Sequence, residues 1–72
     1  MSAQVTILGA GESGEGAAKL CLSLGLSCRV TDASSIAPKR AVRFAEMGVE
    51  IEEGGHDRDA LTASDLLVKS PG

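Results

Sequence analysis

A glycine-rich segment near the amino terminus has the residue types and spacing to bind a phosphate. The segment Gly9-Ala10-Gly11-Glu12-Ser13-Gly14 follows an apolar run and precedes an amphipathic run, and this strand-to-helix context gives a G-x-G-x-x-G spacing its meaning. The first glycine permits a tight turn, the second lets a phosphate approach the backbone, and the third lets the helix pack on the strand. The alternative is a tight turn that binds no ligand.

Backbone amides, rather than side chains, are expected to hold a diphosphate at this segment. The N–H groups of Glu12 and Ser13 stand at the start of the predicted helix, where the helix dipole also favours an anion. The carboxylate of Glu12 would repel phosphate, so we expect it to point outward. Ser13 can offer its hydroxyl to the ligand, serve as the N-cap of the helix, or do both.

Asp32 is the second residue suited to ligand binding. It ends a predicted strand, 18 residues after Gly14. In dinucleotide folds a carboxylate at this place bonds ribose hydroxyls, so Asp32 and the glycines together favour a nucleotide over a bare phosphate. Taken alone, Asp32 is equally explained as a cap or as a solvated strand end.

Hydrophobic periodicity predicts the elements that position these residues. Strands are expected at 4–8, 27–32, 49–52 and 66–68, the last of them buried, and helices at 14–24 and from Pro38 onward, with one or two helical turns at 57–62. The expected buried stripes are Ala17, Leu20, Cys21 and Leu24 in the first helix and Ala41, Phe44, Ala45 and Gly48 in the second. Arg40, Arg43 and Glu46 are expected to face water, and the half-polar strand at 49–52 is expected at a sheet edge.

This alternation of strands and helices predicts a small Rossmann-like α/β domain. Right-handed crossovers give a parallel sheet with strand order 3-2-1-4 and helices on both faces. Ligands of such sheets bind beyond the carboxyl ends of the strands. Four loops, at 9–13, 32–34, 53–56 and 70–72, are therefore expected to converge on one crevice.

Composition limits the classes of protein to consider. A chain of 72 residues forms one small domain that buries roughly 60% of its unfolded surface, and with Phe44 as the single aromatic its core must be aliphatic. Seven basic against ten acidic residues give a net charge of −3. No basic cluster or aromatic platform suggests nucleic acid as a partner. No uncharged run approaches the roughly 20 residues of a membrane helix, so a cytoplasmic location is expected.

The remaining reactive residue types do not assemble into a catalytic site. Cys21 and Cys28 match no metal or redox spacing and are interpreted as buried free thiols. His56 stands without companion ligands and is interpreted as a loop residue. Because no nucleophile with a base, no carboxylate pair and no metal cluster can be assembled, this chain is expected to bind rather than to catalyse.

Five short motifs occur together along nearly the whole chain. They are Leu8-Gly9-Ala10-Gly11-Glu12-Ser13-Gly14, Ala17-Ala18, Val30-Thr31-Asp32, Glu53-Gly54-Gly55-His56 and Ser70-Pro71-Gly72. Together they resemble the Mur ligases, in particular the UDP-N-acetylmuramoylalanine:D-glutamate ligases. The glycine loop alone is a weak signal, but its combination with Gly-Gly-His and Ser-Pro-Gly at these separations is specific to that family.

The resemblance implies that residues 1–72 are the N-terminal domain, which holds the UDP part of UDP-N-acetylmuramoyl-L-alanine. The residues it implicates are Gly11, Glu12, Ser13 and Gly14 at the diphosphate, Asp32, Ala33 and Ser34 beside the uracil, and Ser70 and Gly72 in the same crevice. Ala33 and Ser34 depart from the Thr and Arg of some relatives, which removes a side chain able to stack on uracil. Replacing Asp32 with Ala is expected to weaken uridine binding more than phosphate binding.

The resemblance also implies a larger enzyme. Its central ATPase domain, with bound ATP and Mg²⁺, and its C-terminal domain would lie beyond Gly72, so no cofactor is expected in this chain. The full-length enzyme is expected to be a cytoplasmic monomer that makes a C–N bond in peptidoglycan precursor synthesis and so supports cell shape and division.

Other functions remain open from the sequence. An NAD-binding Rossmann module shares the glycine loop and Asp32, although it does not call for Ser70-Pro71-Gly72 or Gly54-Gly55-His56. A different Mur ligase of the same pathway and a scaffold fragment that binds no ligand are further alternatives.

Overall fold

The computed structural model describes residues 4–55 and 63–69 of the chain. Its elements, in chain order, are β1 (Gln4–Leu8), α1 (Glu12–Ser23), β2 (Ser27–Asp32), α2 (Pro38–Glu46), β3 (Glu50–Glu53) and β4 (Leu66–Lys69). The predicted strands are confirmed to within a residue, and α1 begins two residues earlier than the sequence pattern suggested. The predicted turns at 57–62 lie outside the described residues.

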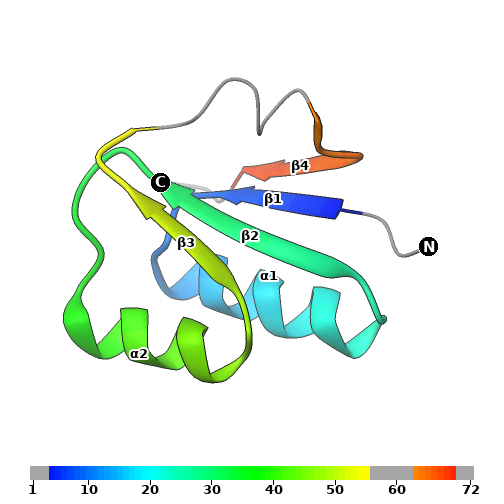
Figure 1. The fold of residues 1–72 in the computed structure, drawn as a ribbon, viewed down its shortest axis with the longest axis horizontal. Coiled ribbons are helices and arrows are strands. Elements are labelled where there is room, and N and C mark those ends of the chain that lie inside the picture. The colour runs from blue at the N-terminus through cyan, green and yellow to red at the C-terminus, as the bar shows by residue number, and fades with distance from the viewer. Residues whose placement is uncertain (1–3, 56–62, 70–72) are drawn as a thin grey trace.

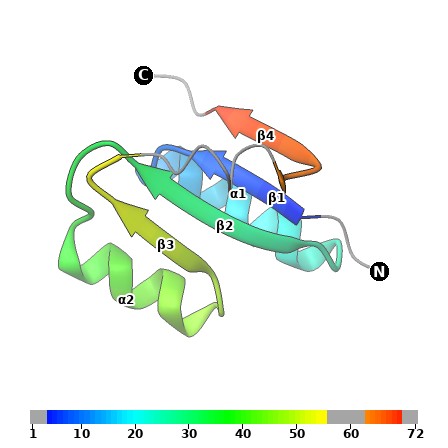
Figure 2. The same ribbon diagram turned by 45° about the horizontal axis from the view of Figure 1, so that its top comes forward.

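The four strands form one parallel sheet with the order β3-β2-β1-β4 (Figure 1). The predicted α/β fold and strand order are therefore confirmed. Both α1 and α2 lie on the same face of the sheet (Figures 1 and 2). Helices were expected on both faces, and residues 56–62, where the remaining helical turns were predicted, lie outside the described part of the chain.

The core lies between this sheet and the two helices. Val5 and Ile7 of β1 are fully buried and stand in register with Cys28 and Val30 of β2. Because side chains alternate along a strand, these four residues form one apolar layer toward the helices. Thr6 points to the opposite face, where it is also buried and shares a hydrogen bond with the hydroxyl of Ser64.

The buried stripe of α1 differs from the prediction. Leu20 and Leu24 were expected in the core, but their exposed fractions are 62% and 65%. Cys21 is buried and Ala17 is partly buried, as expected, and the other buried residues are Gly14 and Ala18, so that the buried positions are i, i+4 and i+7 from Gly14. Gly14 decides this rotation because the helix contacts β1 through it, and about 100° per residue then carries both leucines to the flank.

In α2 the apolar anchor is Phe44, which is fully buried. Ala41 and Met47, one turn away on either side, are partly buried against the core, whereas Ala45 and Gly48 are exposed, contrary to the prediction. Pro38 stands in the first turn as predicted, where its missing N–H costs nothing.

The two outer strands of the described sheet have different surfaces. β3 has the acidic residues Glu50, Glu52 and Glu53 and lies at an edge, as predicted. β4 was expected to be buried, yet Leu66 and Leu67 are about half exposed. The reason is that α1 packs on β1 and β2, and that within the described residues β4 pairs only with β1.

Glu15 joins the two helices. Its carboxylate contacts Arg40 Nη1 at 3.1 Å, Arg43 Nη1 at 3.3 Å and Lys19 Nζ at 3.6 Å. The prediction that Arg40 faces water is therefore wrong, because its side chain is largely covered and pairs with α1, whereas Arg43 is exposed as predicted although it also contacts Glu15. Burial alone would raise the pKa of Glu15, but Arg43, Lys19 and Arg40 together outweigh burial and lower that pKa.

No helix within residues 4–55 and 63–69 has the length and hydropathy to cross a membrane.

Candidate ligand-binding edge

The loop between β1 and α1 takes the shape that the glycine pattern predicts. Gly9 has φ of +112°, a conformation that side chains other than glycine rarely adopt. Its N–H donates to the carbonyl oxygen of Thr31 at 2.7 Å. The turn thus begins directly at the carboxyl end of β1 and is fixed to β2.

The close packing expected of the third glycine is confirmed at Gly14. A Cβ at this position would lie 2.1 Å from the carbonyl oxygen of Gly9 and 3.6 Å from the Ile7 side chain. No larger residue fits without moving α1 away from β1. Gly14 therefore sets the distance and the rotation of the helix that presents the loop amides.

The N-terminus of α1 is open. Its N-cap is Gly11, not Ser13, and no side chain caps the first turn. Glu12 and Ser13 are exposed, so the prediction that Glu12 points outward agrees with its position. Amides of a first helical turn have no partner within the helix, and no described residue accepts a hydrogen bond from the N–H of Glu12 or Ser13. These amides can donate hydrogen bonds to an anion that approaches from solvent.

Asp32 directs both carboxylate oxygens at neighbouring loops. Oδ2 accepts a hydrogen bond from the N–H of Ala10 at 2.8 Å, and Oδ1 accepts one from the N–H of Ser34, also at 2.8 Å. The contact with Ala10 crosses from the end of β2 to the glycine loop. Sequence reasoning placed Asp32 at this edge but did not identify Ala10 as its partner.

The loop after β3 joins the same group. Gly55 donates its N–H to the carbonyl oxygen of Asp32 at 3.2 Å, and Gly54 donates to that of Ser34 at 3.4 Å. Gly54 has φ of +79° and Gly55 has φ of +152°, which explains why this loop contains two glycines. Three of the four loops predicted to converge are thus connected by hydrogen bonds.

The other predicted site residues are placed as follows. Ala33 and Ser34 are exposed beside Asp32 and have no large side chain that could stack on a base. Ser70, Gly72 and His56 lie outside the described residues. Lys69, which the sequence analysis did not select, ends β4 in register with Leu8 and so brings a cation to this edge. Its position immediately before Ser70 is the signal that could have identified it.

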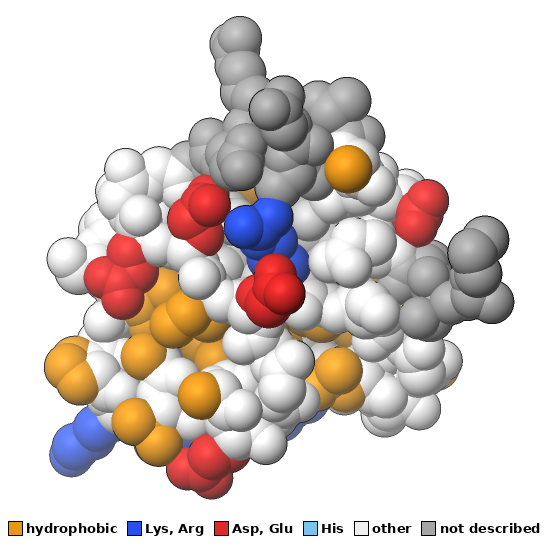
Figure 3. Space-filling view, in the orientation of Figure 1, with side chains coloured by type: hydrophobic (Ala, Val, Ile, Leu, Met, Phe, Trp, Pro, Cys, Tyr) orange, Lys and Arg blue, Asp and Glu red, His pale blue; other side chains and the backbone are white. Residues whose placement is uncertain are grey.

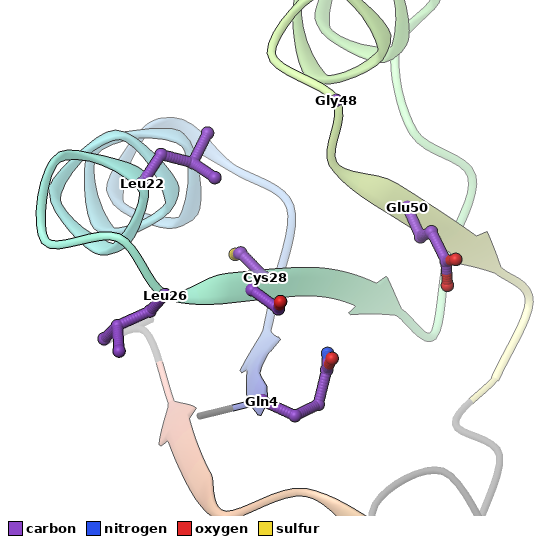
Figure 4. A pocket seen from close by; sticks show the side chains of 7 residues that line it. Gln4, Leu22, Leu26, Cys28, Gly48 and Glu50 are labelled. Atoms are coloured by element: carbon purple, nitrogen blue, oxygen red, sulfur yellow. The ribbon is translucent and has the colours of Figure 1, made fainter. Parts of the chain in front are cut away.

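Two cavities lie away from this edge. One of about 340 Å³ opens at the amino ends of the strands (Figure 4). Its lining residues are Gln4, Leu22, Leu26, Ser27, Cys28, Gly48 and Glu50. A second, of about 320 Å³, lies beside Glu15 and Arg43. Neither is lined by a predicted site residue, so neither adds to the candidate site.

The chemistry of these cavities is limited. Cys28 lines the first cavity, and burial, followed by the nearby Cys21 thiol, raises its pKa to about 11. Both cysteines are free and buried, as predicted. No group of three or more His, Cys, Asp or Glu side chains in the described part of the chain could hold a metal ion. On the face shown in Figure 3, acidic and basic side chains of the described residues are interspersed without a continuous basic surface.

The fold and this edge define a Rossmann-like α/β domain with an open helix N-terminus at the carboxyl ends of its strands. Residues 3–72 match the family model for the N-terminal domain of MurD-like Mur ligases. The chain therefore belongs to this family.

Curated relatives agree with the family. The chain is 39% identical, over its whole length, to a UDP-N-acetylmuramoylalanine–D-glutamate ligase of Cytophaga hutchinsonii, of which it covers 16%. It is 41% identical over 96% of its length to the ligase of that name from Bacteroides fragilis, again covering 16% of the relative. For the Porphyromonas gingivalis ligase the identity is 40% over 94% of the chain and 15% of the relative. The chain thus spans about one sixth of the length of these relatives.

Proposed function

We propose that this chain is the UDP-binding domain of a ligase that adds D-glutamate to UDP-N-acetylmuramoyl-L-alanine. The observation that carries the proposal is the open first turn of α1, where Gly11 leaves the amides of Glu12 and Ser13 accessible beside a loop fixed by Asp32. The names of the relatives supply the identity of the substrate.

The proposed contacts follow from the positions of the residues. Gly11, Glu12, Ser13 and Gly14 would receive the diphosphate on their backbone, since an anion is favoured at a helix N-terminus. Asp32, Ala33 and Ser34 would border the nucleoside attached to that diphosphate, and the hydrogen bond from Ala10 to Asp32 supports this by joining their loop to the glycine loop. Ser70 and Gly72, which lie outside the described residues, are assigned to the same proposed site because they directly follow β4 in the sequence.

In the proposed full-length enzyme, ATP and Mg²⁺ would be held elsewhere. Residues 1–72 contain no Gly-Lys-Thr loop, and no metal-binding group occurs among the described residues. The reaction would phosphorylate the L-alanine carboxylate, and the amine of D-glutamate would then attack the acyl phosphate. This domain would contribute position, because holding the remote UDP group orients the carboxylate at the reacting centre. We place this activity in the cytoplasm, in the synthesis of peptidoglycan precursors.

Backbone amide NMR shifts of the ¹⁵N-labelled chain test the proposal. The chain is titrated with UDP-N-acetylmuramoyl-L-alanine and, separately, with NAD. Ligand concentrations of several millimolar allow binding with a dissociation constant of about 1 mM to be detected. We expect shifts at Glu12, Ser13 and Asp32 with the UDP compound alone. A preference for NAD would establish the dinucleotide alternative, and the absence of shifts with both ligands would contradict the proposal.

A further inference from the structure

We propose that Asp32 is a positioning residue, whose carboxylate holds the glycine loop in the conformation that binds the diphosphate. This rests on the proposed function of the same edge. It differs from the role expected from the sequence, in which the Asp32 side chain serves mainly as a ligand of the nucleoside.

Asp32 provides the hydrogen-bond acceptor for the N–H of Ala10. Ala10 lies between the two glycines that shape the turn, and it is only 4% exposed. Its N–H reaches Asp32 Oδ2 at 2.8 Å. Without that oxygen the amide of a buried residue would lose its acceptor, which is costlier than losing a bond at the surface. The loop conformation therefore depends on the side chain of a residue 22 positions away.

The other carboxylate oxygen of Asp32 contacts the loop after β2. Because Oδ1 accepts the N–H of Ser34, one carboxylate joins the loop after β1 to the loop after β2. The main chain of the same two residues, Asp32 and Ser34, then accepts the amides of Gly55 and Gly54. Replacing this one side chain would loosen the contact between the parts of the edge that must enclose a ligand together.

Electrostatics explain how a carboxylate can stand beside an anion site. An unpaired carboxylate near a diphosphate would repel it. The N–H groups of Ala10 and Ser34 bring their partial positive charge next to the negative carboxylate oxygens, and such charge-assisted hydrogen bonds are strong. Asp32 can therefore order the loop while its negative charge is offset by Ala10 and Ser34.

The two roles of Asp32 predict different binding patterns. If Asp32 acts as a nucleoside ligand, Asp32→Ala weakens UDP binding and leaves inorganic pyrophosphate unaffected. If it acts by positioning, Asp32→Ala weakens both by a similar factor, about tenfold to a hundredfold, because the loss of a hydrogen bond to a charged group disturbs the shared diphosphate site. The amide protons of Ala10 and Ser34 also shift in the ligand-free protein.

The experiment compares Asp32→Ala and Asp32→Asn with the parent chain, each ¹⁵N-labelled and titrated with UDP and with inorganic pyrophosphate. Asn keeps one of the two acceptor oxygens, so we expect it to restore one of the two amide signals and part of the affinity for both ligands. Asp65→Asn is the matched control. Asp65 also accepts a backbone N–H, that of Gln4 at 2.8 Å, but at the amino end of β1, so its replacement should leave the loop amides and both affinities unchanged.

The outcomes separate this inference from the function on which it rests. Weakened UDP binding with unchanged pyrophosphate binding and unmoved Ala10 and Ser34 amides would overturn the positioning role. If the parent chain binds neither ligand, the proposed function fails. In that case the Ala10 and Ser34 amides of the variants still decide whether Asp32 orders the loop.

Discussion

The helices α1 and α2 of the described residues begin at the same edge of the sheet, yet their first turns differ in what they can offer to an anion. Each follows a strand of the parallel sheet and starts at its carboxyl end. The N-cap of α1 is Gly11, which has no side chain to obstruct a ligand, whereas α2 follows Ala37 and begins with Pro38, which has no N–H to donate. A position at the carboxyl edge of the sheet is therefore not sufficient for a helix N-terminus to bind an anion. The residues of the first helical turn must also leave N–H groups that an anion can reach.

The charged residues of α1 and α2 also differ. The first turn of α1 has Glu12 and Glu15 and that of α2 has no acid. Glu15 pairs with Arg40 and Arg43, so these two cations of α2 contact α1. In the proposed site α1 would provide the binding amides, and α2 contacts α1 through Glu15.

The largest expected effect comes from Gly14→Ala. Its Cβ would lie 2.1 Å from the Gly9 carbonyl oxygen, and since that atom belongs to the backbone, the helix itself must move. We expect the free energy of unfolding to fall by about 2–3 kcal/mol, as for an overpacked core, measured by urea denaturation.

Gly16→Ala is the control for that substitution. A Cβ at Gly16 meets nothing within 4 Å, so the better helix propensity of Ala should raise the free energy of unfolding by about 0.5–1 kcal/mol. Equal effects of the two substitutions would show that Gly14 does not set the contact between α1 and β1.

Gly11→Val is expected to abolish diphosphate binding while the chain remains folded. Gly11 has φ of −80° and free space around its Cβ position, so the cost is limited to a poor N-cap, about 1 kcal/mol. The added side chain nevertheless blocks the approach of a phosphate to the backbone. Titration with UDP, followed by the amide shifts of Glu12 and Ser13, measures the loss.

The corresponding change in α2 sharpens the comparison. Ala37→Val alters the N-cap of α2 and should leave UDP binding unchanged. Normal affinity in folded Gly11→Val, or equal loss in both variants, would remove the distinction between the two helix N-termini.

The smallest effect concerns pH and Glu15. Its pKa is lowered in the folded chain from an ordinary value of 4.5 because its three cations outweigh its burial. A lowered pKa stabilises the fold above pH 4.5, and this stabilisation is lost as the pH falls through the folded-state value below 4.5. Glu15→Gln should lower the midpoint of thermal unfolding at pH 6. The difference in midpoint between this variant and the parent chain should become smaller as the pH approaches 3.

Glu46→Gln serves as the control, because it removes a carboxylate from α2 and keeps Glu15 with its cations. If Glu15→Gln and Glu46→Gln showed the same pH dependence, the ion pairs between the helices would not be the cause.

Local patterns predicted the strands and the glycine turn correctly. Val5 and Ile7 alternate in a short apolar run that stops at Gly9, and these signals need no knowledge of the rest of the fold. The stripe of α1 was harder to predict because apolar residues surround the helix, and both Leu20 with Leu24 and Ala18 with Cys21 fit helical spacing. Contact between Gly14 and Gly9 selects the second set, and that contact is tertiary.

Other features depend on residues that are distant in sequence. Asp32 could be placed at the ligand edge from its position after β2, but its bond to Ala10 requires the register of β1 and β2. Likewise, Arg40 follows a helical pattern that predicts solvent exposure, and only the packing of α2 beside α1 brings it to Glu15. Leu66 and Leu67 are apolar enough to suggest burial, whereas their exposure follows from the place of β4 in the strand order.

The buried thiols have a practical consequence for labelling experiments. With a pKa of about 11, only about one Cys28 side chain in ten thousand is a thiolate at pH 7, and the thiolate is the form that reacts with maleimides or iodoacetamides. Cys21 is buried to the same extent. A new cysteine at an exposed site such as Ser34 would therefore react first, so a fluorescent or spin probe can report on the ligand edge with both native cysteines in place.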